Sequence, residues 1–600
     1  MKILLIELII LCLIFCCPRL LKAQDDGTEY EITGFLDELS EELLDLKSHP
    51  LNINTASMSE MEKIPWLNSD QIEEIIKYRN LNQIRNEKQL AVIGIDEITL
   101  SEIRDYISFK NTAPIRLNHV YRLEINRSKI EYPSCLKLYS KTILKRGKLE
   151  AGFITQKDEM EKDLLDYYSY YLQANDLGII NNVIFGKYQI YSGQGILFSS
   201  KLGVGKSVSA TTTPVKKRTY IKPYTSSYEL WALEGVCADI TLDEFQIIPF
   251  ISKTSLSANL KSNKITSFNE SGLHYDLQNK NNVEEAIIGL LGKYETQIFS
   301  AGLNYYSLNF DHEFADPKII NEFSAFSMDL SFFRSSHPVH SEIALINKKM
   351  SCLSSITLNT KNIHQLFLFR SYSNNFPEWH GNPFSSQSGF ANETGFYYGI
   401  TFRPGNKIKL NFYIDLWKFP ETRYFEKMPT VGNEIMFNCN LRLPDDQMLK
   451  FLFKQKNKEK YISLDESKIR DLQKNNFRLD WIKQYNNIKL QTRFELASEY
   501  LPFVKIFKKG YLFSQLLKYN SGFFSIALQI AATDSDLLFY LYEYSVDGAL
   551  SNAILKGNNI YYNLMAGVKP VDFLKLQLKT SGILKDNDTM KLIFQVMINF

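Results

Sequence analysis

The chain has 600 residues, of which 44% are hydrophobic and 13% aromatic, and its formal net charge is +2. This length exceeds a single ordinary soluble core, so we expect two unequal parts. Past the first residues no apolar run reaches the roughly 20 residues of a membrane-spanning helix, which excludes an inner-membrane helical bundle. The 34 tyrosines and 40 phenylalanines favour a strand-rich architecture instead.

The first 23 residues have the pattern of a secretory signal peptide. Lys2 supplies the positive charge, residues 3–17 form the apolar stretch, and a small residue precedes the expected cleavage before Gln24. The alternatives are an uncleaved N-terminal anchor, for which the stretch is short, and a lipoprotein, for which Phe15 is bulky beside Cys16. We therefore expect an exported protein.

Charge divides the mature chain into an acidic and a basic part. Residues 24–110 carry 19 acidic and 8 basic side chains, a net charge of −11, whereas residues 111–600 have a net charge of +11. The expected organisation is a signal peptide (1–23), a helix over 35–47 with a linker (24–50), a small helical domain (51–110) and a strand-rich domain (111–600).

Residues 51–110 alternate helices with tight turns. Thr55 or Ser57 caps a helix that stops at Pro65, and Glu60 is available as the capping-box partner of Ser57. A second helix is expected over 69–79, and the pattern repeats from Glu87. The two turns are candidate contact hairpins for DNA or a partner, and their residues are Pro65, Trp66, Leu67 and Asn68 in the first and Gly94, Ile95 and Asp96 in the second.

The segment LNINTAS (51–57), with the helix, turn and helix ending in Tyr-Arg that follow it, resembles the tandem helix-hairpin-helix domain of ComEA-type DNA-uptake receptors. The resemblance implies hairpins of the form Gly-hydrophobic-Gly, whose backbone N–H groups hold a phosphate. Here Trp66 and Asn68 stand for both glycines of the first hairpin, and Asp96 places a carboxylate in the second. A domain with a net charge of −11 also lacks a cationic field for DNA.

We therefore expect this domain to dock a periplasmic protein partner, with DNA binding as the disfavoured alternative. A local basic strip, or simply a solvated face, is formed by Lys63, Lys77, Arg79, Arg85 and Lys88.

From about residue 115 the hydrophobic period changes to about 2. The segments KIKLNFYIDLWKF (407–419), FLKLQLK (573–579) and LKLYSKTIL (136–144) alternate apolar and polar residues. Repeated segments of this kind, separated by short turns and longer loops, predict a large transmembrane antiparallel β-barrel of roughly 20–26 strands, an even number. A soluble β-sandwich or solenoid is the alternative.

The final strand KLIFQVMINF ends in Phe600 and resembles the recognition signal of outer-membrane barrel assembly. The whole arrangement also resembles a group of Bacteroidetes-type outer-membrane proteins, through GKYQIYSGQGILF (186–198), RTYIKPYTSSYE (218–229) and WKFP (417–420). That resemblance implies an outer-membrane location and this architecture, without an established activity.

Two long loops are candidate functional segments. The loop 193–228 is basic and either folds inward as a constriction favouring anions, faces lipopolysaccharide phosphates, or is an ordinary solvated loop. Its basic residues are Lys201, Lys206, Lys216, Lys217, Arg218 and Lys222. The loop 371–394 is a ligand-contacting or plug loop, or a packed surface loop, and contains Phe376, Trp379, Phe384 and Phe390.

No motif indicates catalysis, a metal or a cofactor. GVGKS (203–207) lacks the glycine of a phosphate loop at Ser200, and the cysteines beyond the leader (Cys135, Cys237, Cys352 and Cys439) are too far apart for a metal site. We expect a non-enzymatic outer-membrane barrel, either a pore or an assembly scaffold. Its expected partners are lipopolysaccharide, the barrel-assembly machinery and a periplasmic protein.

Overall fold

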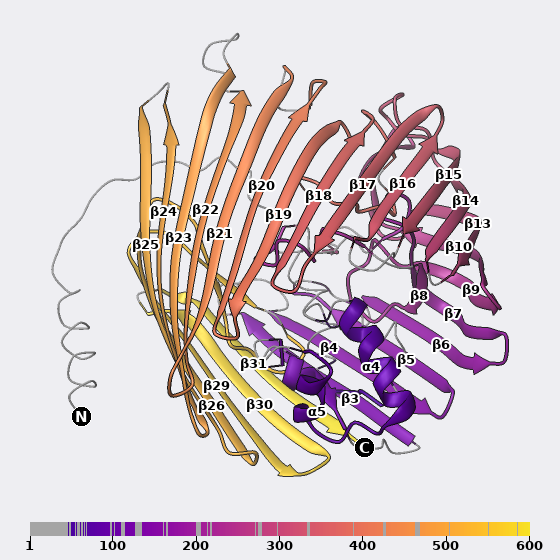
Figure 1. Cartoon of the computed structure of the whole chain (residues 1–600). Coiled ribbons are helices and arrows are strands. Elements are labelled where there is room, and N and C mark those ends of the chain that lie inside the picture. Colours follow the sequence, from indigo (N-terminus) through magenta and orange to yellow (C-terminus); the bar gives the residue numbers. More distant parts are fainter. Residues whose placement is uncertain are drawn as a thin grey trace, which may run out of the picture.

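The computed structural model describes Leu46 and most of residues 50–109 and 115–600, with its longer gaps at 57–60, 96–98, 127–134, 200–205, 274–278, 333–336, 424–427 and 462–468. The predicted signal peptide and nearly all of the predicted helix over 35–47 lie outside the described residues. Figure 1 shows a small helical module and a large ring of strands. Within the residues described, no helix has both the length and the apolar character needed to cross a membrane.

The helical module has a core of its own. It contains β1 (Leu51–Asn52), α4 (Ser69–Leu81), α5 (Glu87–Val92), the 3-10 turn η1 (Arg104–Tyr106) and β2 (Ile107–Ser108), which pairs parallel with β1. Apolar side chains from each part meet in this core, among them Ile53, Ile64, Ile72, Ile75, Ile84, Leu90, Ile95 and Ile103. The helix predicted over 69–79 is confirmed.

Polar side chains of the LNINTAS segment lock the start of the module to its middle. The Asn54 amide donates to the carbonyl of Ile84 and accepts from its N–H, both at 2.8 Å. Arg79, at the end of α4, donates to the carbonyls of Ile53 (3.0 Å) and Ala56 (2.6 Å). Arg79 therefore serves inside the module, and the predicted basic strip is wrong at this position.

Within the described residues, 24 strands close into one antiparallel barrel, as the sequence predicted. They are β3 (Ile115–Asn126), β4 (Leu136–Arg146), β5 (Leu149–Lys157), β6 (Tyr167–Leu177), β7 (Ile180–Tyr191), β9 (Leu233–Leu242), β10 (Phe245–Leu256), β13 (Val283–Glu295), β14 (Phe299–Phe310), β15 (Glu322–Phe332), β16 (Val339–Ile346), β17 (Lys349–Asn359), β18 (Ile363–Tyr372), β19 (Glu393–Gly405), β20 (Ile408–Phe419), β21 (Thr430–Leu443), β22 (Gln447–Tyr461), β23 (Ile469–Tyr485), β24 (Ile488–Leu501), β25 (Ile506–Asn520), β26 (Phe524–Ser535), β29 (Asn559–Val571), β30 (Leu574–Ile583) and β31 (Asp586–Asn599).

Three short additions accompany these strands. β8 (Tyr220–Pro223) pairs with the last residues of β7, beyond the stretch that pairs with β9. Two hairpins, β11 (Ala258–Lys261) with β12 (Lys264–Phe268) and β27 (Phe539–Tyr542) with β28 (Asn552–Leu555), lie in loops.

The two ends of the barrel differ in their connections. The barrel closes where β31 pairs with β3, and Leu117 and Phe600 exchange backbone hydrogen bonds of 3.1 and 2.9 Å. Both barrel termini therefore lie at the end that carries short turns such as 147–148, 243–244 and 486–487. Long connections, including 192–232, 257–282, 373–392 and 536–558, lie at the opposite end.

The outer face of the barrel carries an apolar belt. Leu290, Tyr305, Phe326 and Leu345 are register partners on β13 to β16, and each is between 45% and 49% exposed. In an antiparallel sheet directly paired residues share a face, so this row is continuous around four strands. A closed barrel with such a belt satisfies the requirements of a bilayer, because all backbone groups are paired and no strand edge is open.

The inner face is divided into a covered and an open sector. From β7 to β21 the inward side chains are mostly buried, and the apolar ones form one cluster with side chains from the long loops. On β22 to β25 many inward side chains are half-exposed. Polar inward side chains such as Asp329, Glu342 and Arg370 are buried in the covered sector beside the apolar cluster.

Candidate functional site

The chain that leaves β7 turns into the barrel and is held there by a buried carboxylate. Glu342, on β16, is fully buried and accepts from the backbone N–H groups of Gln194 (2.7 Å) and Ile196 (3.1 Å). Gly193 has φ +49°, and a Cβ there would lie 2.8 Å from the Glu342 carboxyl carbon, so the close approach requires glycine. We call residues 192–199, 206–212 and 214–216 the inward segment.

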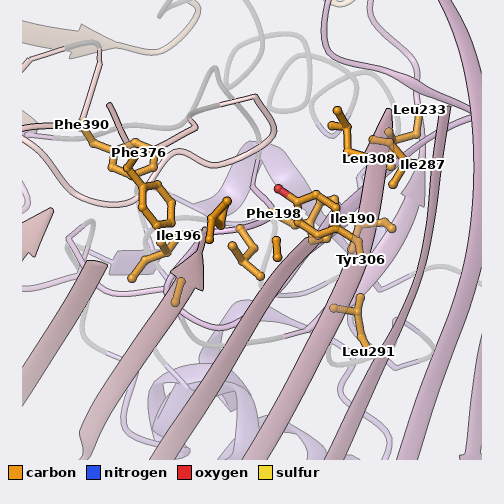
Figure 2. Packing of buried hydrophobic residues seen from close by; sticks show 14 of the residues in the cluster. Ile190, Ile196, Phe198, Leu233, Ile287, Leu291, Tyr306, Leu308, Phe376 and Phe390 are labelled. Carbon is orange, nitrogen blue, oxygen red and sulfur yellow. The ribbon is translucent and has the colours of Figure 1, made fainter. Parts of the chain in front are cut away.

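Aromatic packing fixes the inward segment against the wall. The ring of Phe198 lies 5.4 Å from that of Phe250 and 4.9 Å from that of Tyr306, measured between centroids. Figure 2 shows Phe198 beside the wall residues Ile190 and Tyr306, and Ile196 belongs to the same buried cluster. The described part of the basic loop therefore folds inward, and the alternative of an ordinary solvated loop is wrong for it.

The loop 373–392 covers the same sector. Phe376, Phe384 and Phe390 are buried in the cluster, and Figure 2 shows Phe376 and Phe390 beside Ile196. The backbone joins the two loops, since Ser199 N–H donates to His380 O (2.8 Å) and Asn382 N–H donates to Gly195 O (2.9 Å). The loop 373–392 therefore forms an internal cover together with the inward segment.

Lys216 ties the far end of the inward segment to this cover. Its Nζ donates to Ser199 Oγ and Asn382 O, and its carbonyl accepts from the Gln194 amide at 2.6 Å. Burial lowers the pKa of Lys216 to about 7, and the nearby Glu342 carboxylate offsets part of that change. The folded cover therefore favours the neutral amine.

This pKa predicts that the internal cover tightens as pH rises. A released segment has a lysine with an ordinary pKa of 10.5, so between about pH 7 and 10 the released state binds more protons and docking strengthens with pH. We expect fewer opening events in single-channel currents at pH 9 than at pH 6.5. Lys216→Met should remove most of this difference, and equal pH dependence in both proteins would contradict the assignment.

A buried ion-pair network lies on the inner faces of β18 to β21. Arg370 is fully buried and pairs with Glu393 and, through two nitrogens at 2.7 and 3.2 Å, with Asp415. Lys206, from the inward segment, lies 2.5 Å from Asp415 and 3.9 Å from Glu434. The predicted loop residue Lys206 therefore belongs to a charge network that links the cover to the wall.

The network continues to the open sector through Glu434. Tyr413 donates to Glu434 at 2.6 Å, and the ammonium groups of Lys454 and Lys456 lie 3.2 and 4.0 Å from its carboxylate. Lys456 also lies 5.6 Å above the ring of Trp417. The side chains of Lys454 and Lys456 are 39% and 31% exposed. The ion-pair network therefore extends from the buried Arg370–Asp415 pair to a part of the wall that water reaches.

A third inward element comes from the connection between β26 and β29. After β27, Glu543 accepts from the buried Lys579 of β30 at 2.5 Å, and Asp547 O accepts from Gln595 of β31 at 2.6 Å. Sequence reasoning missed this element and the ion-pair network, because their charges lie in strands and loops far apart in the chain.

The other predicted site residues are spread over the molecule. Lys222 lies on β8 with its ammonium 5.0 Å from the ring centroid of Tyr191. Lys201, Lys217 and Arg218 lie outside the described residues. Phe600 is exposed, and its ring stacks on Phe573 at 4.9 Å beside the barrel closure.

Gly94 and Ile95 are the described residues of the module's second hairpin. Gly94 has φ +99° and Ile95 is buried in the module core, while Val92, at the end of α5, is 80% exposed. In the first hairpin Leu67 is buried. Pro65, Trp66, Asn68 and Asp96 lie outside the described residues.

Comparison with known proteins gives one family match and several distant structural similarities. Residues 47–108 match the helix-hairpin-helix motif family. No curated protein matches the sequence. The barrel is similar to the siderophore receptor PirA from Pseudomonas aeruginosa (TM-score 0.41, 7% identity, 82% of each chain covered) and to the copper transporter OprC (TM-score 0.41, 8% identity, 82% of this chain and 81% of that one).

A smaller part of the chain is similar to an anion-selective porin from Comamonas acidovorans, with a TM-score of 0.27 and 10% identity over 52% of this chain and 89% of the porin. At these TM-scores the similarities carry no argument about what this chain binds or transports. The argument for function therefore rests on the residues of its own interior.

Proposed function

We propose that this chain is a non-enzymatic outer-membrane barrel that passes solutes through a water-filled space between its internal cover and the open wall of β22 to β25. The observation that carries the proposal is the unequal interior, where one sector is sealed by the inward segment and the loop 373–392. The adjoining sector, β22 to β25, keeps half-exposed charged side chains such as Lys454, Lys474 and Arg478. A hydrated inner wall is expected of a barrel that passes solutes and is not expected of a closed scaffold.

The orientation of the barrel follows from its two ends. Outer-membrane barrels have short periplasmic turns and longer external loops. The barrel termini lie at the short-turn end, which supports a periplasmic helix-hairpin-helix module and external cover loops. Lipopolysaccharide and the barrel-assembly machinery, with Phe600 as the assembly signal, are the membrane partners that this placement implies.

The module serves to dock a periplasmic protein. Val92, at the end of α5 beside the second hairpin, is an exposed apolar side chain that a protein partner would bury, and Arg79 is used within the fold. DNA binding of the ComEA type is the second candidate, because residues 47–108 match the helix-hairpin-helix family.

A binding assay separates these two roles of the module. We expect full-length protein and a variant lacking residues 51–108 to bind duplex DNA equally weakly at physiological salt. DNA affinity that depends on the module and falls steeply with salt would show several phosphate contacts and favour the DNA-uptake role.

Location and topology can be tested in cells. We expect the protein to co-fractionate with the outer membrane, and a protease added to intact cells to leave the module uncut. Cleavage of the module in intact cells, or recovery of the protein in the soluble fraction, would contradict the proposal.

A further inference from the structure

Part of the connection between β26 and β29 crosses the inner wall of the barrel. Tyr542 O accepts a hydrogen bond from the Gln529 amide of β26 at 3.1 Å, and Tyr544 O accepts one from the Asn563 amide of β29 at 2.9 Å. Since β26 and β29 are neighbours in the sheet, these two contacts follow the wall from one strand to the next. We call residues 542–548 the strap.

Charged side chains fix the strap to β30. Glu543 accepts a hydrogen bond from Lys579 at 2.5 Å. Further along the strap, Asp547 pairs with Lys575 and accepts from the Gln577 amide at 3.3 Å. Lys579 is fully buried and Glu543 is nearly so, and separating a buried ion pair is unfavourable. The strap is therefore held firmly one strand away from the end of the barrel sheet.

The strap ends on the two strands that close the barrel. Asp547 O accepts from the Gln595 amide of β31 at 2.6 Å and from the Arg122 guanidinium of β3 at 3.4 Å. Arg122 also donates to the side-chain oxygen of Gln595 at 2.7 Å, and the two residues are direct partners in the pairing of β3 with β31. The strap therefore runs across β26, β29, β30, β31 and β3, which are neighbours in that order.

The burial of the wall residues places the strap inside the barrel. Lys579 and Gln595, which contact the strap, are both 0% exposed. Leu578 and Phe594, one position earlier on the same strands, are 47% and 39% exposed. Successive side chains of a strand point to opposite faces, so these two apolar residues belong to the outer surface and the strap lies on the inner one.

The seam between β3 and β31 differs from every other pairing in the described barrel. Each other pair of neighbouring strands is joined by a turn or a loop of the chain, whereas β3 and β31 are connected only through all the strands between them. No short connection limits how far these two strands separate. An open seam would expose two unpaired strand edges, which are templates for pairing with another chain.

We propose that the strap is a latch that holds the seam between β3 and β31 closed. Its contacts with β30 place Asp547 O where it binds Gln595 and Arg122 together, so the strap supplies the tie that the chain connection lacks. When the strap is released, the seam keeps only its own strand pairing and opens more often than the other pairings do. A latched seam keeps the lumen separate from the surrounding lipid.

The test is hydrogen–deuterium exchange of the full-length protein in lipid vesicles, measured by mass spectrometry of its peptides. The strap variant combines Glu543→Gln, Lys579→Met and Asp547→Ala, which removes the contacts with β30 without leaving a fully buried charge. We expect the paired amides of β3 and β31 to exchange roughly tenfold faster in this variant. Amides of β23 and β24 should change by less than about twofold.

A matched control makes the same kinds of substitution away from the seam. Arg478 lies 2.9 Å from Glu495 and Arg493 lies 2.7 Å from Asp480, all on the inner faces of β23 and β24. Glu495→Gln, Arg478→Met and Asp480→Ala should leave exchange at the seam within about twofold of the unmodified protein. Equal effects of the two triple variants at the seam, or a strap variant whose seam exchanges at the original rate, would overturn the latch.

A disulfide across the seam keeps the test decisive where the strap variant fails to refold. Val120 and Met597 are direct partners, three positions from the Leu117–Phe600 pair that exchanges both backbone hydrogen bonds. They therefore form a non-hydrogen-bonded pair, in which side chains lie closer together. Val120→Cys with Met597→Cys, once oxidised, should restore refolding and slow exchange to the strap variant. A variant that stays unfolded under oxidising conditions, or exchanges as fast with the disulfide formed, would show that the strap does not act through the seam.

Discussion

Arg370→Met is expected to lower the free energy of unfolding by about 3–5 kcal/mol, the cost typical of removing one partner of a buried ion pair. Arg370 and its partners Glu393 and Asp415 are fully buried. After the substitution Asp415 keeps Lys206 at 2.5 Å, and Glu393 keeps the Ser386 N–H and hydroxyl. Glu393 is therefore the carboxylate that loses its buried cationic partner. The measurement is denaturant-induced unfolding of the protein refolded in lipid vesicles.

A matched control distinguishes a buried charge from a surface charge. Lys253, 68% exposed, pairs with Glu284 at 2.9 Å, and Lys253→Met should cost less than about 1 kcal/mol. Adding Glu393→Gln to Arg370→Met should recover part of the loss, because it removes the orphaned carboxylate. Similarly small decreases in the free energy of unfolding for Arg370→Met and Lys253→Met would show that the buried network does not stabilise the barrel.

Glu342→Ala is expected to release the inward segment and enlarge the proposed passage. The substitution leaves the N–H groups of Gln194 and Ile196 without their buried acceptor, at a cost of roughly 1–3 kcal/mol each. Glu342 lies on the wall, whereas its two donors belong to the inward segment. The lost hydrogen bonds therefore weaken the docking of the inward segment against the wall. We expect a larger and noisier single-channel conductance than in the unmodified protein.

Glu342→Gln is the control for this prediction. It keeps the side-chain length and one carbonyl acceptor for the two N–H groups, so its conductance should stay close to that of the unmodified protein. A Glu342→Ala channel with unchanged conductance and noise would mean that the inward segment is held by its aromatic packing alone.

The barrel could be predicted because its evidence is local. The alternation of KIKLNFYIDLWKF indicated the strand that the structure shows as β20, and the chain of such segments predicted a closed antiparallel barrel. Likewise the spacing of apolar residues after Ser69 predicted α4. In each case a short stretch of sequence determines the periodicity.

The interior could not be predicted because it depends on register. Arg370, Glu393 and Asp415 lie on three successive strands, and a slip of one residue in any pairing would turn a side chain to the other face. The lysines of β22 are visible as KQKNK, but only their pairing with β21 places them inside. The basic loop was recognised as a unit, although Lys206 and Lys216 serve different partners.

The most direct test of the account is the single-channel current of purified full-length protein in a planar lipid bilayer. The proposed passage predicts steady conductance at neutral pH, which grows when Glu342→Ala releases the cover. A protein that inserts into the bilayer but carries no current above the bare membrane would contradict the passage and leave the barrel as a closed scaffold.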